Sequence, residues 1–233
     1  MRIENIVGQL PVHPTARYKT RSTINTAVIH HSATPVTTTP WAIANYHVAI
    51  RGYPQIAYHY LAYNNGRVYQ VNEDTTLSWH AGDGTNHPNN ENNKAVGIAL
   101  VGDFTKAPPP EAQLVATREL LAHLQDKYGP LRVIGHREGW YRGKYGVPTA
   151  CPGDAFTNEM VRALAPTSGD TKIREAVWAQ FAHWPEAIRQ VARQRGFGAP
   201  LGQPTTIMGE TIYPFALGLL VANGDVVIRD LVW

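Results

Sequence analysis

Hydrophobic and polar positions change between a strand-like and a helix-like period along the first two thirds of the chain. Short apolar runs of strand length occur in TAVIHH (26–31), KAVGIALVGDF (94–104) and LRVIGH (131–136). The segment IAYHYLAYNNGRVYQV (56–71) has two aromatic and β-branched runs around Asn64-Asn65-Gly66. That turn signal predicts a β-hairpin.

Two other segments have the period and the punctuation of helices. TTTPWAIANYHVAI (37–50) offers Thr39 as the N-cap and Pro40 at the first helical position. PPPEAQLVATRELLAHLQDKYG (108–129) has a leucine-rich stripe and ends at Gly129 before a proline. Strands and helices intermix along the chain. We therefore expect an α/β fold in which a single mixed central β-sheet is flanked by helices.

The pattern changes after residue 165. Residues 166–170 read as a linker, which would separate a domain over 1–165 from a small α+β segment over 171–233. Two apolar runs around Asn223-Gly224 predict a hairpin in that segment. Residues 171–196 carry five basic and two acidic side chains. An excess of positive charge suits an anionic wall polymer, and a solvated helix face is the alternative interpretation.

Composition excludes several classes of protein. The 233 residues are 43% hydrophobic and 17% charged, with a net charge of +3, which is too weak to indicate a nucleic-acid partner. The longest apolar run, YPFALGLLVA (213–222), is too short to insert across a membrane. The first twenty residues lack the apolar stretch of a signal peptide, so we expect synthesis in the cytoplasm.

Two adjacent histidines end the first apolar run. Side chains alternate between the faces of a strand, so His30 and His31 should point in opposite directions and one of them should serve a given site. His136 ends a second strand, and Cys151 precedes a probable helix start. Two imidazoles and a thiolate with an open fourth position are typical of catalytic zinc. A lone cysteine is more often a small buried apolar residue, so spacing alone leaves both interpretations open.

Six segments in order add a family resemblance. The stretches VIHHSAT, AYHYLAYNNGRVYQ, SWHAGDG, AVGIALVGDF, VIGHRE and TACPG cover roughly residues 24–165. In this order they resemble the type 2 N-acetylmuramoyl-L-alanine amidase family, which also includes phage lytic amidases and animal peptidoglycan recognition proteins. The resemblance implies a zinc-dependent enzyme that cleaves the amide bond between N-acetylmuramic acid and L-alanine in bacterial peptidoglycan.

The resemblance also assigns residues. It implies one Zn²⁺ per chain, with His30, His136 and Cys151 as the ligands, and it leaves His31 to packing or a hydrogen bond on the other face. Tyr58 matches the family tyrosine beside the metal. Further matches give Thr149 a position held by lysine or a small hydroxyl residue, and His80 a position that lines the substrate groove.

One position departs from the family pattern. Some members carry a glutamate general base in the strand where this chain has Ala99. The acid–base work would then fall to Tyr58 or to another group. Glu91 and Glu138 are near in the sequence, and we interpret both as surface charges. His59 should lie on the face opposite Tyr58, which favours a structural role.

Within this family, the lack of a signal-peptide pattern favours a phage endolysin that acts on the wall after release. Residues 171–233 lie outside the amidase resemblance, and we expect them to form a wall-binding module. That segment is also faintly similar to the LGFP-type repeats of wall-associated proteins. A bacterial enzyme that recycles wall fragments in the cytoplasm also fits. Two other classes remain open. One is a non-catalytic peptidoglycan recognition module, which commonly lacks a zinc ligand. The other is a wall peptidase in which Cys151 is the nucleophile and no metal is needed.

Overall fold

The computed structural model describes residues 3–82, 90–139, 149–166, 179–186, 188–189, 191, 202–207, 210–215, 218–223 and 226–232. The chain divides into two compact units. One comprises Glu4–Ala165, and the other comprises Pro166–Trp233 together with Met1–Ile3. Most of the predicted linker, 167–170, lies outside the described residues, as do Lys172, Arg174, Arg193 and Arg195 of the predicted basic segment.

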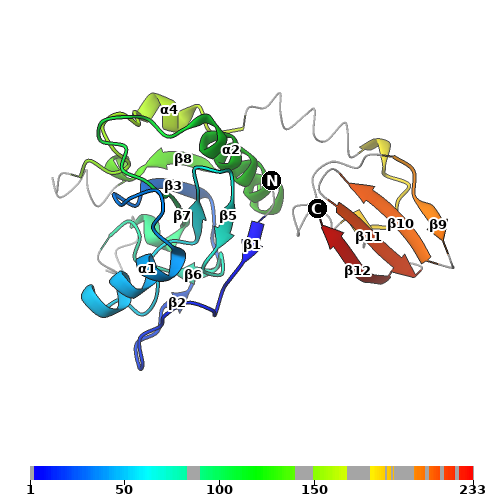
Figure 1. Cartoon of the computed structure of the whole chain (residues 1–233), viewed down its shortest axis with the longest axis horizontal. Coiled ribbons are helices and arrows are strands. Elements are labelled where there is room, and N and C mark those ends of the chain that lie inside the picture. The colour runs from blue at the N-terminus through cyan, green and yellow to red at the C-terminus, as the bar shows by residue number, and fades with distance from the viewer. Residues whose placement is uncertain are drawn as a thin grey trace. The chain divides into compact units, whose positions relative to one another are not determined.

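A six-stranded mixed sheet forms the centre of the larger unit (Figure 1). Its order is β1 (Ile3–Asn5), β5 (Val68–Gln70), β4 (Tyr60–Ala62), β7 (Ala95–Leu100), β3 (Thr26–His31) and β8 (Arg132–Gly135). β4, β7, β3 and β8 pair in parallel, whereas β4 and β5 form the predicted antiparallel hairpin. β2 (Lys19–Thr20) and β6 (Thr76–Leu77) form a separate two-stranded ribbon. The predicted mixed α/β architecture is confirmed.

The two central strands explain the uninterrupted apolar runs of the sequence. Every residue of β3 and of β7 is buried. Parallel strands that are covered on both faces lack the alternation of half-exposed strands, because neither face meets water. The register pairs Val28 with Gly97 and His30 with Ala99. The end of β3 is therefore fixed against a row of small residues on β7.

Helices lie on both sides of this sheet (Figure 1). They are α1 (Pro40–Asn45), α2 (Glu111–Tyr128) and α4 (Asn158–Arg162), with a π-helical turn η1 (Tyr46–Ile50) after α1. The Thr39 hydroxyl accepts a hydrogen bond from the Ala42 amide, which confirms the predicted N-cap. Ile43 and Ala44 pack with Leu61 and Ala99 on one face of the sheet. None of the helices in the described ranges is long and apolar enough to cross a membrane.

The smaller unit contains a four-stranded antiparallel sheet. Its strands are β9 (Thr205–Ile207), β10 (Glu210–Phe215), β11 (Gly218–Asn223) and β12 (Val226–Val232), in the order β12-β11-β10-β9. β11 and β12 pair as the predicted hairpin, although Gly224 itself lies outside the described residues. The buried rings of Trp184 and Tyr213 meet edge to face with centroids 5.0 Å apart, which gives this unit a small core of its own.

Candidate metal centre

Three metal-ligating side chains meet at the edge where β3 and β8 end. His30 is in β3, and His136 begins the 3-10 turn η3 (His136–Glu138) directly after β8. Cys151 lies in the segment that follows. One ligand atom from each of the three residues lies within 4.8 Å of the others. Adjacent parallel strands end at the same edge of a sheet, and for this reason residues 106 positions apart come together.

The distance between two of these atoms matches that between two ligands of a tetrahedral zinc site. His30 Nδ1 lies 3.6 Å from Cys151 Sγ. A zinc ion with Zn–S of about 2.3 Å and Zn–N of about 2.0–2.1 Å would hold two tetrahedral ligands about 3.6 Å apart. The ring centroids of His30 and His136 are 4.5 Å apart. Two imidazoles and one thiol are a donor set that zinc prefers, so the residues fit this metal.

Burial prepares His30 for a ligand's role. Its side chain is 1% exposed, and burial lowers the pKa of the imidazole well below its ordinary value, with His136 and His80 adding to the shift. The ring is therefore neutral at physiological pH. Metal binding needs the neutral form, because a protonated ring nitrogen has no lone pair to give.

Arg137 holds the backbone around Cys151. Its guanidinium Nη2 donates to the carbonyls of Ala150 at 3.1 Å and Phe156 at 3.4 Å, and also to that of Gly153. Gly153 has a φ of +111°, and a Cβ atom there would collide with the Phe104 backbone. The sequence therefore needs glycine at this point for the segment to approach so closely.

Thr149 takes part in the same segment. Its hydroxyl oxygen accepts a hydrogen bond from the Cys151 amide at 3.2 Å. This contact orders the backbone that presents the thiol, and it leaves the hydroxyl proton available to another acceptor. The predicted contact of Thr149 with substrate or water stays a prediction.

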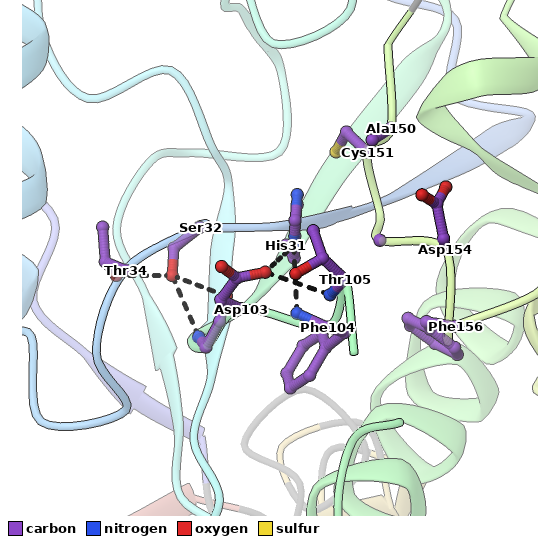
Figure 2. Close-up of polar contacts among 12 residues, drawn as sticks. His31, Ser32, Thr34, Asp103, Phe104, Thr105, Ala150, Cys151, Asp154 and Phe156 are labelled. Atoms are coloured by element: carbon purple, nitrogen blue, oxygen red, sulfur yellow. Dashed lines mark hydrogen bonds and ion pairs between the residues drawn. The ribbon is translucent and has the colours of Figure 1, made fainter. Parts of the chain in front are cut away.

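His31 makes different contacts from His30. Its Nδ1 accepts a hydrogen bond from the Phe104 amide at 3.3 Å and lies 3.9 Å from the Asp103 carboxylate. Figure 2 shows these contacts, with Cys151 and Asp154 nearby. Burial lowers the pKa of His31, with Asp103 opposing the shift. The ring therefore anchors the loop after β7.

Tyr58 lies beside His30, with ring centroids 5.3 Å apart. Its ring also meets that of His47 at 5.4 Å. Burial raises the pKa of Tyr58 above its ordinary value, so the phenol keeps its proton at physiological pH. His59 is buried and bonded to the backbone through both nitrogens, since Nδ1 accepts from the Gly97 amide and Nε2 donates to the Thr76 carbonyl, each at 2.8 Å.

His80 lies behind His30. His80 Nδ1 is 3.1 Å from His30 Nε2, and His80 Nε2 is 3.0 Å from the Ala95 carbonyl oxygen. The side chain is only 5% exposed. Its predicted contact with substrate stays a prediction. The link to His30 was not visible in the sequence, where the two residues stand 50 positions apart.

The two glutamates differ, because Glu91 is buried and is not the surface charge that we expected, whereas Glu138 is partly exposed. Glu91 is 1% exposed, in the 3-10 turn η2 (Glu91–Asn93). Glu138 accepts a hydrogen bond from the Gly135 amide at 3.1 Å and pairs with Arg162. Glu91 lies in the Asn-rich stretch NNENN (89–93). Its asparagines bond to the backbone, as Asn92 does in accepting from the Ala81 amide at 2.8 Å, so polarity here does not imply exposure.

Comparison with known proteins gives matches to one family. A family model described as N-acetylmuramoyl-L-alanine amidase matches residues 20–154. The pig N-acetylmuramoyl-L-alanine amidase is 31% identical over 161 residues, which cover 64% of this chain and 24% of the pig protein. Peptidoglycan-recognition protein 1 of Holotrichia diomphalia is 30% identical over 109 residues, which cover 44% of this chain and 52% of that protein. The chain thus spans from about a quarter to about half of the length of these relatives.

Solved structures agree. The endolysin of the Thermus scotoductus bacteriophage Ph2119 superposes with a TM-score of 0.57 at 28% identity, covering 71% of this chain and all of the endolysin. The N-acetylmuramoyl-L-alanine amidase LysC of Clostridium intestinale gives a TM-score of 0.53 at 25% identity and covers 70% and 96% of the two chains. Each of these structures aligns with a longer part of this chain than residues 20–154, which the family model matches.

Proposed function

Because this chain belongs to the N-acetylmuramoyl-L-alanine amidase family, we propose that it hydrolyses the amide bond between N-acetylmuramic acid and L-alanine in peptidoglycan. We propose further that the reaction depends on one Zn²⁺ per chain, held by His30, His136 and Cys151. The observation that carries this proposal is the convergence of one ligand atom from each of these residues to within 4.8 Å.

The same observation favours catalysis over recognition alone. Relatives of this chain include proteins named for peptidoglycan recognition as well as amidases. A recognition module needs no metal, whereas an open three-ligand zinc site is the arrangement of a hydrolase. This chain keeps all three donors, including Cys151, in one cluster.

A bound zinc ion would act as a Lewis acid that activates water and polarises the scissile carbonyl. The protein residues have separate tasks. Tyr58, with its raised pKa, donates its phenolic proton in a hydrogen bond to the oxygen on which negative charge develops. Thr149 holds the Cys151 amide and can donate its own hydroxyl proton to the substrate. Ala99 offers no carboxylate beside them.

Similarity to a phage endolysin over 71% of this chain supports a role in host-cell lysis. In this proposal the protein is made in the cytoplasm and reaches the wall after release. The smaller unit then serves as a wall-binding module for anionic polymers, which raises the local concentration of substrate. If charge drives this contact, binding of the full chain to purified walls weakens as salt is added.

The decisive experiment is mass spectrometry of purified peptidoglycan after digestion. New L-alanine amino termini are expected, together with about one zinc per chain, loss of activity in a strong chelator and recovery when zinc is added. Wall binding without new amino termini would identify a recognition module. Full activity in chelator with loss on thiol alkylation would identify a cysteine peptidase.

A further inference from the structure

Three buried groups form a line that leads away from the proposed metal position. His30 directs Nδ1 toward Cys151 Sγ at 3.6 Å and Nε2 toward His80 Nδ1 at 3.1 Å. His80 in turn directs its Nε2 toward the Ala95 carbonyl oxygen at 3.0 Å. Both imidazoles are at most 5% exposed, so water does not compete for these contacts.

The order of donors along this line follows from its last member. A carbonyl oxygen only accepts hydrogen bonds, so His80 Nε2 must carry the proton that it gives to Ala95. A neutral imidazole has one N–H, which leaves His80 Nδ1 as an acceptor. His30 Nε2 must then be the donor to it. The lone pair of His30 consequently lies on Nδ1, the nitrogen that faces Cys151.

We propose that His80 is a positioning residue that holds His30 in the tautomer and ring orientation needed to bind zinc through Nδ1. This inference rests on the proposed function. Histidine ligands commonly donate their second N–H to a carboxylate, a carbonyl or water. Here the acceptor is the imidazole of His80, which is itself held by its hydrogen bond to the Ala95 carbonyl in β7.

The fold leaves space for this imidazole by keeping one face of β7 small. A Cβ atom at Gly97 would lie 2.5 Å from His80 Cγ. Gly97 pairs with Val28 of β3, two residues before His30. Glycine is thus needed here for space, because the His80 ring lies directly against the strand. The requirement for glycine and the contact with His30 are two independent signs that the ring has one defined position.

The first test measures zinc affinity by competition with a chromophoric chelator. His80→Leu removes the acceptor while keeping an apolar side chain of similar size, and we expect zinc affinity to fall about 10–100-fold. His80→Asn places an amide oxygen near the position of Nδ1, and we expect affinity within about threefold of the parent on the same scale. Such rescue by an acceptor is not expected of a residue that only fills space.

His59→Leu is the matched control. His59 is equally buried and meets the His80 ring with centroids 5.4 Å apart, but its nitrogens bond to Gly97 and Thr76. We expect the folded control to keep the zinc affinity of the parent. Equal affinity for the parent and a folded His80→Leu would overturn the inference. A parent that binds no zinc would overturn the proposed function itself.

The second test needs no substitution. In ¹⁵N-histidine-labelled protein without metal, long-range ¹H–¹⁵N spectra report which nitrogen of each ring carries the proton. We expect the proton on Nε2 of both His30 and His80, and loss of the lone-pair shift of His30 Nδ1 when zinc is added. A proton on His80 Nδ1, or zinc on His30 Nε2, would contradict the proposal even if the variants fail to fold.

Discussion

The backbone N–H of Arg137 donates to the carbonyl of Cys151 at 3.0 Å. The residue after one candidate ligand, His136, therefore holds the backbone of another. The guanidinium adds contacts to three more carbonyls of the same segment. The segments that carry His136 and Cys151 are thus held together by Arg137. A substitution of Arg137 should therefore displace the Cys151 thiol.

Arg137→Lys tests whether these contacts position Cys151. Lysine keeps the charge but not the planar fork, so it cannot reach the same set of carbonyls. We expect zinc affinity to fall about tenfold, the size of effect seen for outer contacts of metal sites. Competition with a chelator measures it. Arg162→Lys is the control, because Arg162 is exposed and its pairing with Glu138 should contribute about 0–1 kcal/mol. An equal loss of zinc affinity in both variants would contradict a specific role of Arg137 in positioning Cys151.

Substitution of the paired histidines should separate their roles. His30→Ala should abolish zinc binding and activity. His31→Ala should keep the zinc and lose about 1–2 kcal/mol of unfolding free energy, because the Phe104 amide loses its acceptor. Metal analysis and chemical denaturation of both variants measure this. If His31→Ala empties the site while His30→Ala remains active, the assignment is reversed.

Tyr58→Phe removes the phenolic hydroxyl and keeps the ring. Loss of one oxyanion partner typically lowers the rate about 10²–10³-fold, and we expect that loss with the zinc content unchanged. Tyr63→Phe is the control, since its hydroxyl donates to the Thr38 carbonyl at 2.7 Å. The rate at which peptides with an amino-terminal L-alanine are released distinguishes the Tyr58→Phe variant from the Tyr63→Phe control. A Tyr58→Phe enzyme as fast as the control would assign the step to another residue.

Gly97→Ala should act on the metal through His80. The added methyl group would lie 2.5 Å from His80 Cγ, so the ring must move away from His30. We expect a loss of about 1–3 kcal/mol from overpacking and weaker zinc binding. Gly202→Ala is the control, because a Cβ there meets no atom of the described residues within 4 Å. Unchanged zinc affinity in a folded Gly97→Ala variant would show that zinc binding does not require the observed position of the His80 ring.

His59 should make the free energy of unfolding depend on pH. Burial lowers its pKa in the folded protein from the ordinary 6.5 to about 3. As the pH falls below 6.5, the unfolded chain takes up a proton that the folded chain refuses. The stabilising contribution is therefore full above pH 6.5 and is lost toward pH 3.

Denaturant unfolding at pH 7.0 and 4.5 measures this dependence. Relative to the parent, His59→Gln should lose about 2.5 kcal/mol less on going to the lower pH, since one pKa unit corresponds to about 1.4 kcal/mol. Both proteins are compared without metal so that zinc release does not contribute. Parallel pH profiles for the two proteins would exclude His59 as the source.

Local sequence signals were sufficient for most of the sheet and helices. Uninterrupted apolar runs marked β3 and β7, Thr39 and Pro40 marked the start of α1, and Asn64-Asn65-Gly66 marked the hairpin. These signals work because they act within a few residues. The π-helical turn at 46–50 was not expected, since its sequence continues the period of α1.

Contacts between distant segments were not predictable in this way. His30 and His80 are 50 positions apart, and Arg137 reaches carbonyls 13–19 residues away. Glu91 was misinterpreted because its Asn-rich surroundings satisfy the backbone instead of facing water. Such positions depend on how elements pack in three dimensions, and no periodicity records this.

The parallel register of β3 has a consequence for misfolding. Two histidines in succession mean that a strand displaced by one residue would still offer an imidazole on the metal's side, since such a slip exchanges the two faces. In the observed register Gly97 pairs with Val28 and Gly135 pairs with Ile29, and a Cβ at these glycines would crowd His80 and Pro152, respectively. Strand pairing therefore decides which of the two histidines faces the metal position, because both residues carry the same side chain.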